Sequence, residues 1–122
     1  MDRGETTAQA VLAVPVLLLF LLFGIQATLY FHTAQLAALA AQDGAIAGSA
    51  VGGSEVHAIA AAIQSAAEQR ASADITPVVY MADGVIEVEV MLPVPSVIPL
   101  FPSSVTRSAS EPLERFVLEV DR

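Results

Sequence analysis

The chain has 122 residues, 55% of them hydrophobic, and its 13 acidic residues against five basic ones give a net charge of −8. This acidic balance disfavours a nucleic-acid partner, because phosphate binding needs a basic protein face. The sequence contains no cysteine, which excludes disulfide bonds and thiolate metal sites within these residues.

Residues 10–31 form an uncharged apolar segment in which Gln26 is the only strongly polar side chain. At ~1.5 Å of rise per residue, a helix of this length crosses the ~30 Å hydrocarbon layer of a bilayer. Its fourteen Leu, Ile, Phe and Val residues favour membrane insertion by about 4–8 kcal/mol in total. We therefore predict a transmembrane helix at 10–31, with membrane lipid as a partner, and we expect Pro15 to kink it.

The positive charges around this segment predict its orientation. Arg3 precedes the segment, and the next arginine in the chain is Arg70. By the positive-inside rule, residues 1–9 stay in the cytoplasm and the C-terminal part is exported. We expect a single-pass protein of the cytoplasmic (inner) membrane. A secreted protein released by signal cleavage near 37–45 is an alternative, but the apolar segment is longer than a usual signal sequence.

Residues 32–51 contain strong helix formers and no breaker before Gly52, so we expect the helix to continue beyond the membrane. Ala40, Gly44 and Gly48 recur in this stretch at four-residue spacing. Small residues at this spacing let a second helix approach closely, although simple enrichment in alanine for helix propensity is an alternative explanation. We interpret them as a helix-packing row and expect homo- or hetero-oligomers to form through helices.

Residues 54–122 predict a small outer domain that begins with an amphipathic helix at 54–71, capped by Ser54. The expected apolar stripe of this helix consists of Val56, Ile59, Ala60, Ile63 and Ala67. A hairpin at 75–92 follows, with Asp83 and Gly84 at its turn. Its second strand alternates between apolar and acidic residues, with Ile86, Val88, Val90 and Leu92 on the inner face.

A loop at 93–102 contains four prolines and joins the hairpin to a C-terminal strand predicted at 114–121. Four apolar residues near its centre and end are Val97, Ile98, Leu100 and Phe101. They form either an exposed surface for a partner or a lid over the sheet. The predicted fold class is thus α+β, with a long N-terminal transmembrane helix that continues into a pilin-like outer domain of one helix and an antiparallel sheet.

No pattern in the sequence predicts catalysis, a cofactor or a metal site. His32 and His57 are isolated from each other and from other ligand types at metal-binding spacing. Glu87 and Glu89 lie two apart on one strand face, which is typical of a solvated outer face rather than of an acid–base pair. We expect a protein that is not an enzyme.

The run from Arg3 to Ala10, RGETTAQA, leads directly into an apolar helix that contains the step Val14-Pro15-Val16. This arrangement resembles the TadE-like pilus assembly proteins, minor pilins or pseudopilins of the tight-adherence (Flp) branch of the type IV pilus system. The C-terminal stretch SASEPLERF is similar to one common in actinobacterial members. The resemblance implies cleavage by a membrane prepilin peptidase between Gly4 and Glu5. Gln9 stands where these pilins usually carry a glutamate.

The resemblance implies a structural role in pilus assembly, and through it in adhesion or secretion. The expected partners are other pilin or pseudopilin subunits and the pilus assembly machinery, in the membrane or at the cell surface. A permanently anchored adaptor of an export apparatus is the alternative. Gln9 favours that alternative, because a neutral amide cannot pair with a neighbouring terminal ammonium as a glutamate would.

Overall fold

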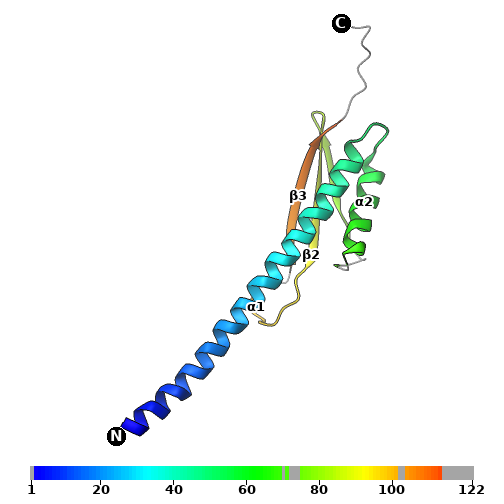
Figure 1. The fold of residues 1–122 in the computed structure, drawn as a ribbon. Helices are drawn as coiled ribbons and strands as arrows, with labels where there is room; N and C mark the ends of the chain where they lie inside the picture. The colour runs from blue at the N-terminus through cyan, green and yellow to red at the C-terminus, as the bar shows by residue number, and fades with distance from the viewer. Residues whose placement is uncertain (1, 70, 72–74, 102–103, 114–122) are drawn as a thin grey trace, which may run out of the picture.

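The computed structural model describes residues 2–69, 71, 75–101 and 104–113. These residues form helix α1 (Asp2–Ser49), helix α2 (Glu55–Glu68) and a sheet of three antiparallel strands, β1 (Val78–Ala82), β2 (Val85–Pro93) and β3 (Ser104–Pro112). In Figure 1 the C-terminal half of α1 packs with α2 and the sheet, while its N-terminal half projects alone. We call the packed part the head domain. The architecture confirms the predicted α+β fold class.

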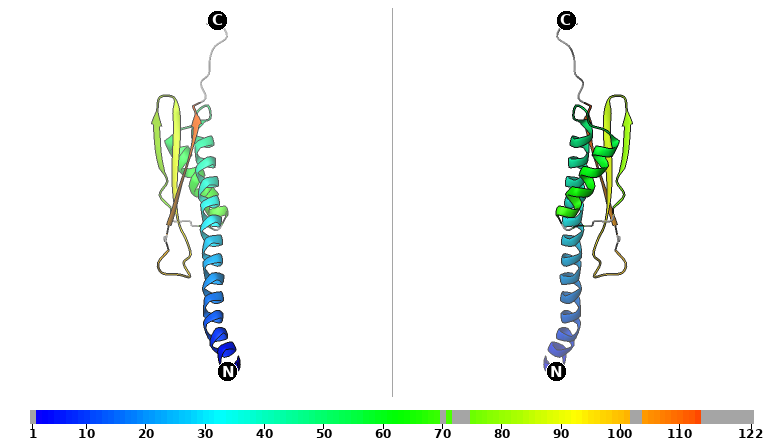
Figure 2. Two further views of the ribbon diagram at one scale, coloured as in Figure 1. Left: turned by 90° about the vertical axis from the view of Figure 1, so that its left-hand side faces the viewer. Right: turned by 90° about the vertical axis from the view of Figure 1, so that its right-hand side faces the viewer.

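Helix α1 is a single element of 48 residues, about 72 Å long at 1.5 Å per residue. It continues through Pro15, and Figure 2 shows its N-terminal end curving gently. The helix ends just before a turn in which Gly52 takes a positive φ of 79°, a conformation that favours glycine. Ser54 then caps α2, since its side chain accepts a hydrogen bond from the His57 backbone N–H.

Strands β1 and β2 form the hairpin expected from the sequence, with Val79 opposite Val88. Asp83 and Gly84 both have positive φ, 53° and 76°, as the two-residue turn of a twisted hairpin requires. Along β2 the four apolar residues assigned to the inner face are all fully buried: Ile86, Val88, Val90 and Leu92. Their alternation with acidic residues therefore predicted the inner face correctly.

Strand β3, Ser104–Pro112, pairs with β2 along its whole length, from Val85 opposite Pro112 to Pro93 opposite Ser104. The sequence pattern predicts no strand in this segment. Val105 is the only buried apolar residue of β3. The strand therefore lacks the alternation of apolar and polar residues that would predict it from the sequence. The strand predicted at 114–121 lies outside the described residues.

The core lies between α1, α2 and the inner face of the sheet, and alanines provide most of the helical contribution. The apolar stripe predicted for α2 is only partly correct. Ile63 packs against the core, but Val56 is 74% exposed, and the buried residues of this helix are Ala58, Ala62, Ser65 and Ala66. The face of α2 that carries small side chains packs against α1, because only small side chains let the two helices lie this close together.

Candidate functional site

The N-terminal half of α1 exposes large apolar side chains that the head domain does not cover. Leu12 is 70% exposed and Phe20 is 71% exposed. The most apolar 18-residue stretch of the helix has no buried residue. An apolar surface of this extent is unfavourable in water, and its length suits a bilayer. This part of α1 is therefore a candidate membrane span.

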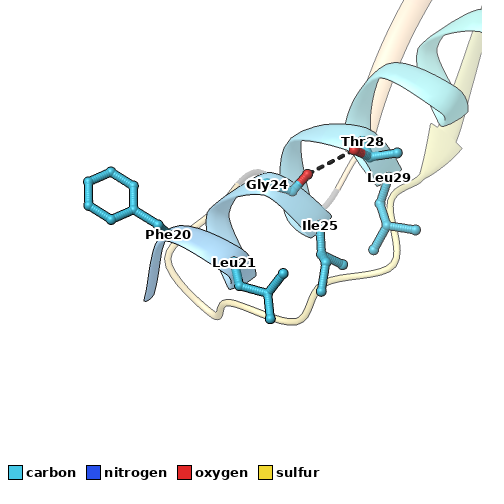
Figure 3. A pocket seen from close by; sticks show the side chains of 6 residues that line it. All are labelled: Phe20, Leu21, Gly24, Ile25, Thr28 and Leu29. Atoms are coloured by element: carbon cyan, nitrogen blue, oxygen red, sulfur yellow. Dashed lines mark hydrogen bonds between the residues drawn. The ribbon is translucent and has the colours of Figure 1, made fainter. Parts of the chain in front are cut away.

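The polar side chains of this segment are satisfied within the chain. The Thr28 hydroxyl donates to the Gly24 carbonyl at 2.8 Å, a bond that removes a polar group from contact with lipid. Figure 3 shows this bond beside an apolar hollow on the surface of α1. The hollow is lined by Phe20, Leu21, Gly24, Ile25, Thr28 and Leu29. Glycine at position 24 leaves room there for an acyl chain or for a side chain of another helix.

Gln26 connects α1 to the proline-rich loop 94–101. Its side chain is fully buried, its Nε2 donates to the Pro95 carbonyl at 3.3 Å, and its Oε1 accepts from the Val97 N–H at 2.8 Å. One amide thus satisfies a backbone acceptor and a backbone donor about 70 residues away in the sequence. In the sequence, Gln26 stands out only as the one strongly polar residue of the span, and no local pattern predicts this role.

The same loop contacts α1 through aromatic rings. Phe101 meets Phe23 edge to face, with ring centroids 5.3 Å apart, a geometry that aromatic pairs prefer. The loop therefore lies along α1 (Figure 1) rather than over the sheet, so the expectation of a lid over the sheet is wrong. Val97 and Leu100 stay exposed, Leu100 at 94%.

The row Ala40, Gly44 and Gly48 is the place where α1 meets α2 and β2 of the same chain. Ala40 is fully buried. A Cβ added at Gly44 would lie 2.9 Å from the Ala58 carbonyl O and 3.1 Å from the Val88 Cγ1. The row thus packs a second helix closely, but that helix belongs to the same chain. Its glycines are filled internally and cannot also receive a helix from another subunit.

One polar contact crosses this helix pair. The Ser65 hydroxyl, on the buried face of α2, donates to Asp43 Oδ2 on α1 at 2.6 Å. Gln69 Nε2 donates to the Ser65 hydroxyl at 3.0 Å. The Ser65–Asp43 bond joins α2 to α1 at one level, and the bond from Gln69 holds the Ser65 hydroxyl in place.

The residues of the expected cleavage site lie at the exposed N-terminal end of α1. Gly4, Glu5 and Gln9 are all helical and exposed, and a Cβ at Gly4 would meet no atom within 4 Å. In Figure 2 none of the described helices and strands lies beside this end of α1. Cleavage between Gly4 and Glu5, and the role of Gln9, remain predictions from the resemblance.

The two histidines lie apart and do not form a common site. His32 is exposed on α1, while His57 Nδ1 lies 2.8 Å from the Ser54 hydroxyl at the start of α2. Among the described residues, no three His, Cys, Asp or Glu side chains group as metal ligands would. The absence of a catalytic centre remains an expectation from the sequence.

The comparison with protein families concerns helix α1. The model of the family described as TadE-like protein matches residues 4–45, which is nearly all of α1. Searches of curated proteins and of solved structures gave no significant match. The match confirms the resemblance seen in the N-terminal sequence and associates the chain with Tad pilus assembly. Over residues 4–45, the chain is therefore similar to the TadE-like proteins.

Proposed function

We propose that this chain is a minor pilin-like, non-enzymatic structural subunit in the assembly of a tight-adherence (Flp, type IV-like) pilus. The observation that carries the proposal is the bare apolar half of α1, which projects from the head domain and lies within the matched residues 4–45. In the membrane this half contacts lipid, with the N-terminus in the cytoplasm. On assembly, other pilin helices replace the lipid.

The packing surface for other subunits is the projecting half of α1 rather than the row of small residues. The row at Ala40, Gly44 and Gly48 is filled by the chain's own α2, so contacts between subunits fall on the exposed side chains of the projecting half. Leu18 and Leu19 there are 55% and 54% exposed. Burying side chains of this type against neighbouring helices supplies dispersion contacts, which drive helix association in an apolar environment.

A crosslinking experiment in the native host tests this proposal. A photo-crosslinking residue replaces Leu18, on the projecting half, and a matched control replaces Val56, which is exposed on α2. We expect crosslinks to pilin subunits from position 18 and the protein itself in the sheared pilus fraction. Deletion of the gene should abolish pili. Pili that form normally without the protein would refute the proposal.

The second candidate is a permanently membrane-anchored adaptor of the pilus export apparatus. Gln9 favours it, because this exposed neutral side chain cannot form the charge-assisted bond of a pilin glutamate. N-terminal sequencing of the membrane-extracted protein separates the two. A mature start at Glu5 supports the pilin-like subunit, whereas an intact Met1 together with exclusion from sheared pili supports the adaptor. Conversion of Gln9→Glu should increase recovery in the sheared fraction only if the chain enters the filament.

A further inference from the structure

The proline-rich loop 94–101 exposes apolar side chains that no other part of the head domain covers among the described residues. Leu100 is 94% exposed and Val97 is 48% exposed, and no charged residue occurs between Glu89 and Arg107. Large apolar side chains at the tip of a loop are unfavourable in water unless something covers them.

The loop is held at a defined level of α1. Gln26 binds its backbone at Pro95 and Val97, and Phe101 lies against Phe23. Both helix positions fall inside the apolar segment 10–31. They lie about 8 and 12 Å before its end at Phe31, at 1.5 Å of rise per residue. A bilayer around this segment therefore reaches the loop as well.

The backbone of the loop suits an environment with little water. Pro95 and Pro99 have no N–H to satisfy. The Val97 N–H donates to Gln26, the Phe101 N–H donates to the Ile98 carbonyl, and the Ser96 hydroxyl donates to the same carbonyl. Irregular backbone at membrane depth needs partners for its polar groups, and these bonds supply partners for the Val97 and Phe101 N–H groups.

We propose that this loop is a second membrane-contacting element, which inserts Val97 and Leu100 into the leaflet on the side of the head domain. The occupant of its exposed surface is lipid, since the loop continues the lipid-facing surface of α1 at the same level. Insertion at two points would fix the tilt and rotation of the head domain on the membrane, which one helix alone leaves free. The inference rests on the proposed membrane-spanning role of α1.

The sequence contains no cysteine, so single-cysteine labelling tests this directly. The full chain carries an environment-sensitive fluorophore at Leu100→Cys, at Phe20→Cys on the projecting helix, or at Val56→Cys on α2. All three native side chains are more than 70% exposed. Each variant is reconstituted at low protein-to-lipid ratio into phosphatidylcholine–phosphatidylglycerol vesicles. Nitroxide on the shallow part of an acyl chain and aqueous iodide serve as quenchers.

We expect the labels at positions 100 and 20 to be quenched by the lipid nitroxide several-fold more than the label at 56, with the opposite order for iodide. Lipid quenching at 20 with iodide quenching at 100 would overturn the loop inference and leave the span intact. Protection of position 100 from both quenchers would mean that protein covers the loop, and would also overturn the inference. Iodide access at position 20 would refute the span, and the loop inference with it.

Discussion

The contact of Gly44 with α2 allows a quantitative test of how the head domain is held on α1. A methyl group at this position would lie 2.9 Å from the Ala58 carbonyl O, 3.1 Å from Ala62 Cβ and 3.1 Å from Val88 Cγ1. The carbonyl belongs to the backbone of α2 and cannot rotate away, so α2 or the sheet must shift. Overpacking of this kind costs up to ~3 kcal/mol.

The variant Gly44→Ala should therefore lose stability although alanine is the better helix former. The gain in helix propensity is about 1 kcal/mol, which leaves a net loss of up to about 2 kcal/mol. For a domain of this size, that loss lowers the midpoint of thermal unfolding by up to about 8–16 °C. Circular dichroism of the full chain in mild detergent measures the midpoint.

The matched control is Gly24→Ala, since a Cβ there meets no atom within 4 Å. Both variants gain the same propensity term, so the difference between their midpoints reports the clash at Gly44 alone. We expect the control to melt at or slightly above the wild-type temperature. If Gly44→Ala proved as stable as the control, the close approach of α2 to α1 would be wrong.

Three further variants test individual hydrogen bonds. Gln26→Leu leaves the Val97 N–H without its acceptor, at a cost of about 1–3 kcal/mol. Hydrogen exchange of the Val97 amide, followed by NMR, should accelerate about tenfold or more. Unchanged exchange would contradict the bond between Gln26 and the loop. Ser65→Ala removes the donor to Asp43 and should destabilise the head domain by about 1–2 kcal/mol. A loss of stability no larger than that of a surface Ser→Ala change would refute a role of this bond in holding α2 on α1. Ser54→Ala removes the cap that accepts the His57 N–H and should cost about 1 kcal/mol in a denaturant titration; restoration by Ser54→Asp would show that capping is the cause.

The sequence by itself determined the parts of this protein that depend on local composition and period. The uncharged run at 10–31 predicted a long apolar helix, because insertion energy and helix length depend only on residue type and count. Strict alternation in β2 and the Asp83–Gly84 turn predicted the hairpin, since both are local signals. The N-terminal pattern around Gly4 and Glu5 also sufficed for the resemblance that the family match confirmed.

Only the tertiary structure decided which surfaces meet. Ala40, Gly44 and Gly48 predicted a close helix contact, but no local signal states that the partner is α2 of the same chain. The buried face of α2 is its alanine face rather than its larger apolar stripe, because the available gap, not hydrophobicity, selects the side chains that fit. Strand β3 depends on pairing with β2, and Gln26 acquires its role from a loop about 70 residues away. Contacts between distant segments depend on three-dimensional distance, which a period along the chain does not encode.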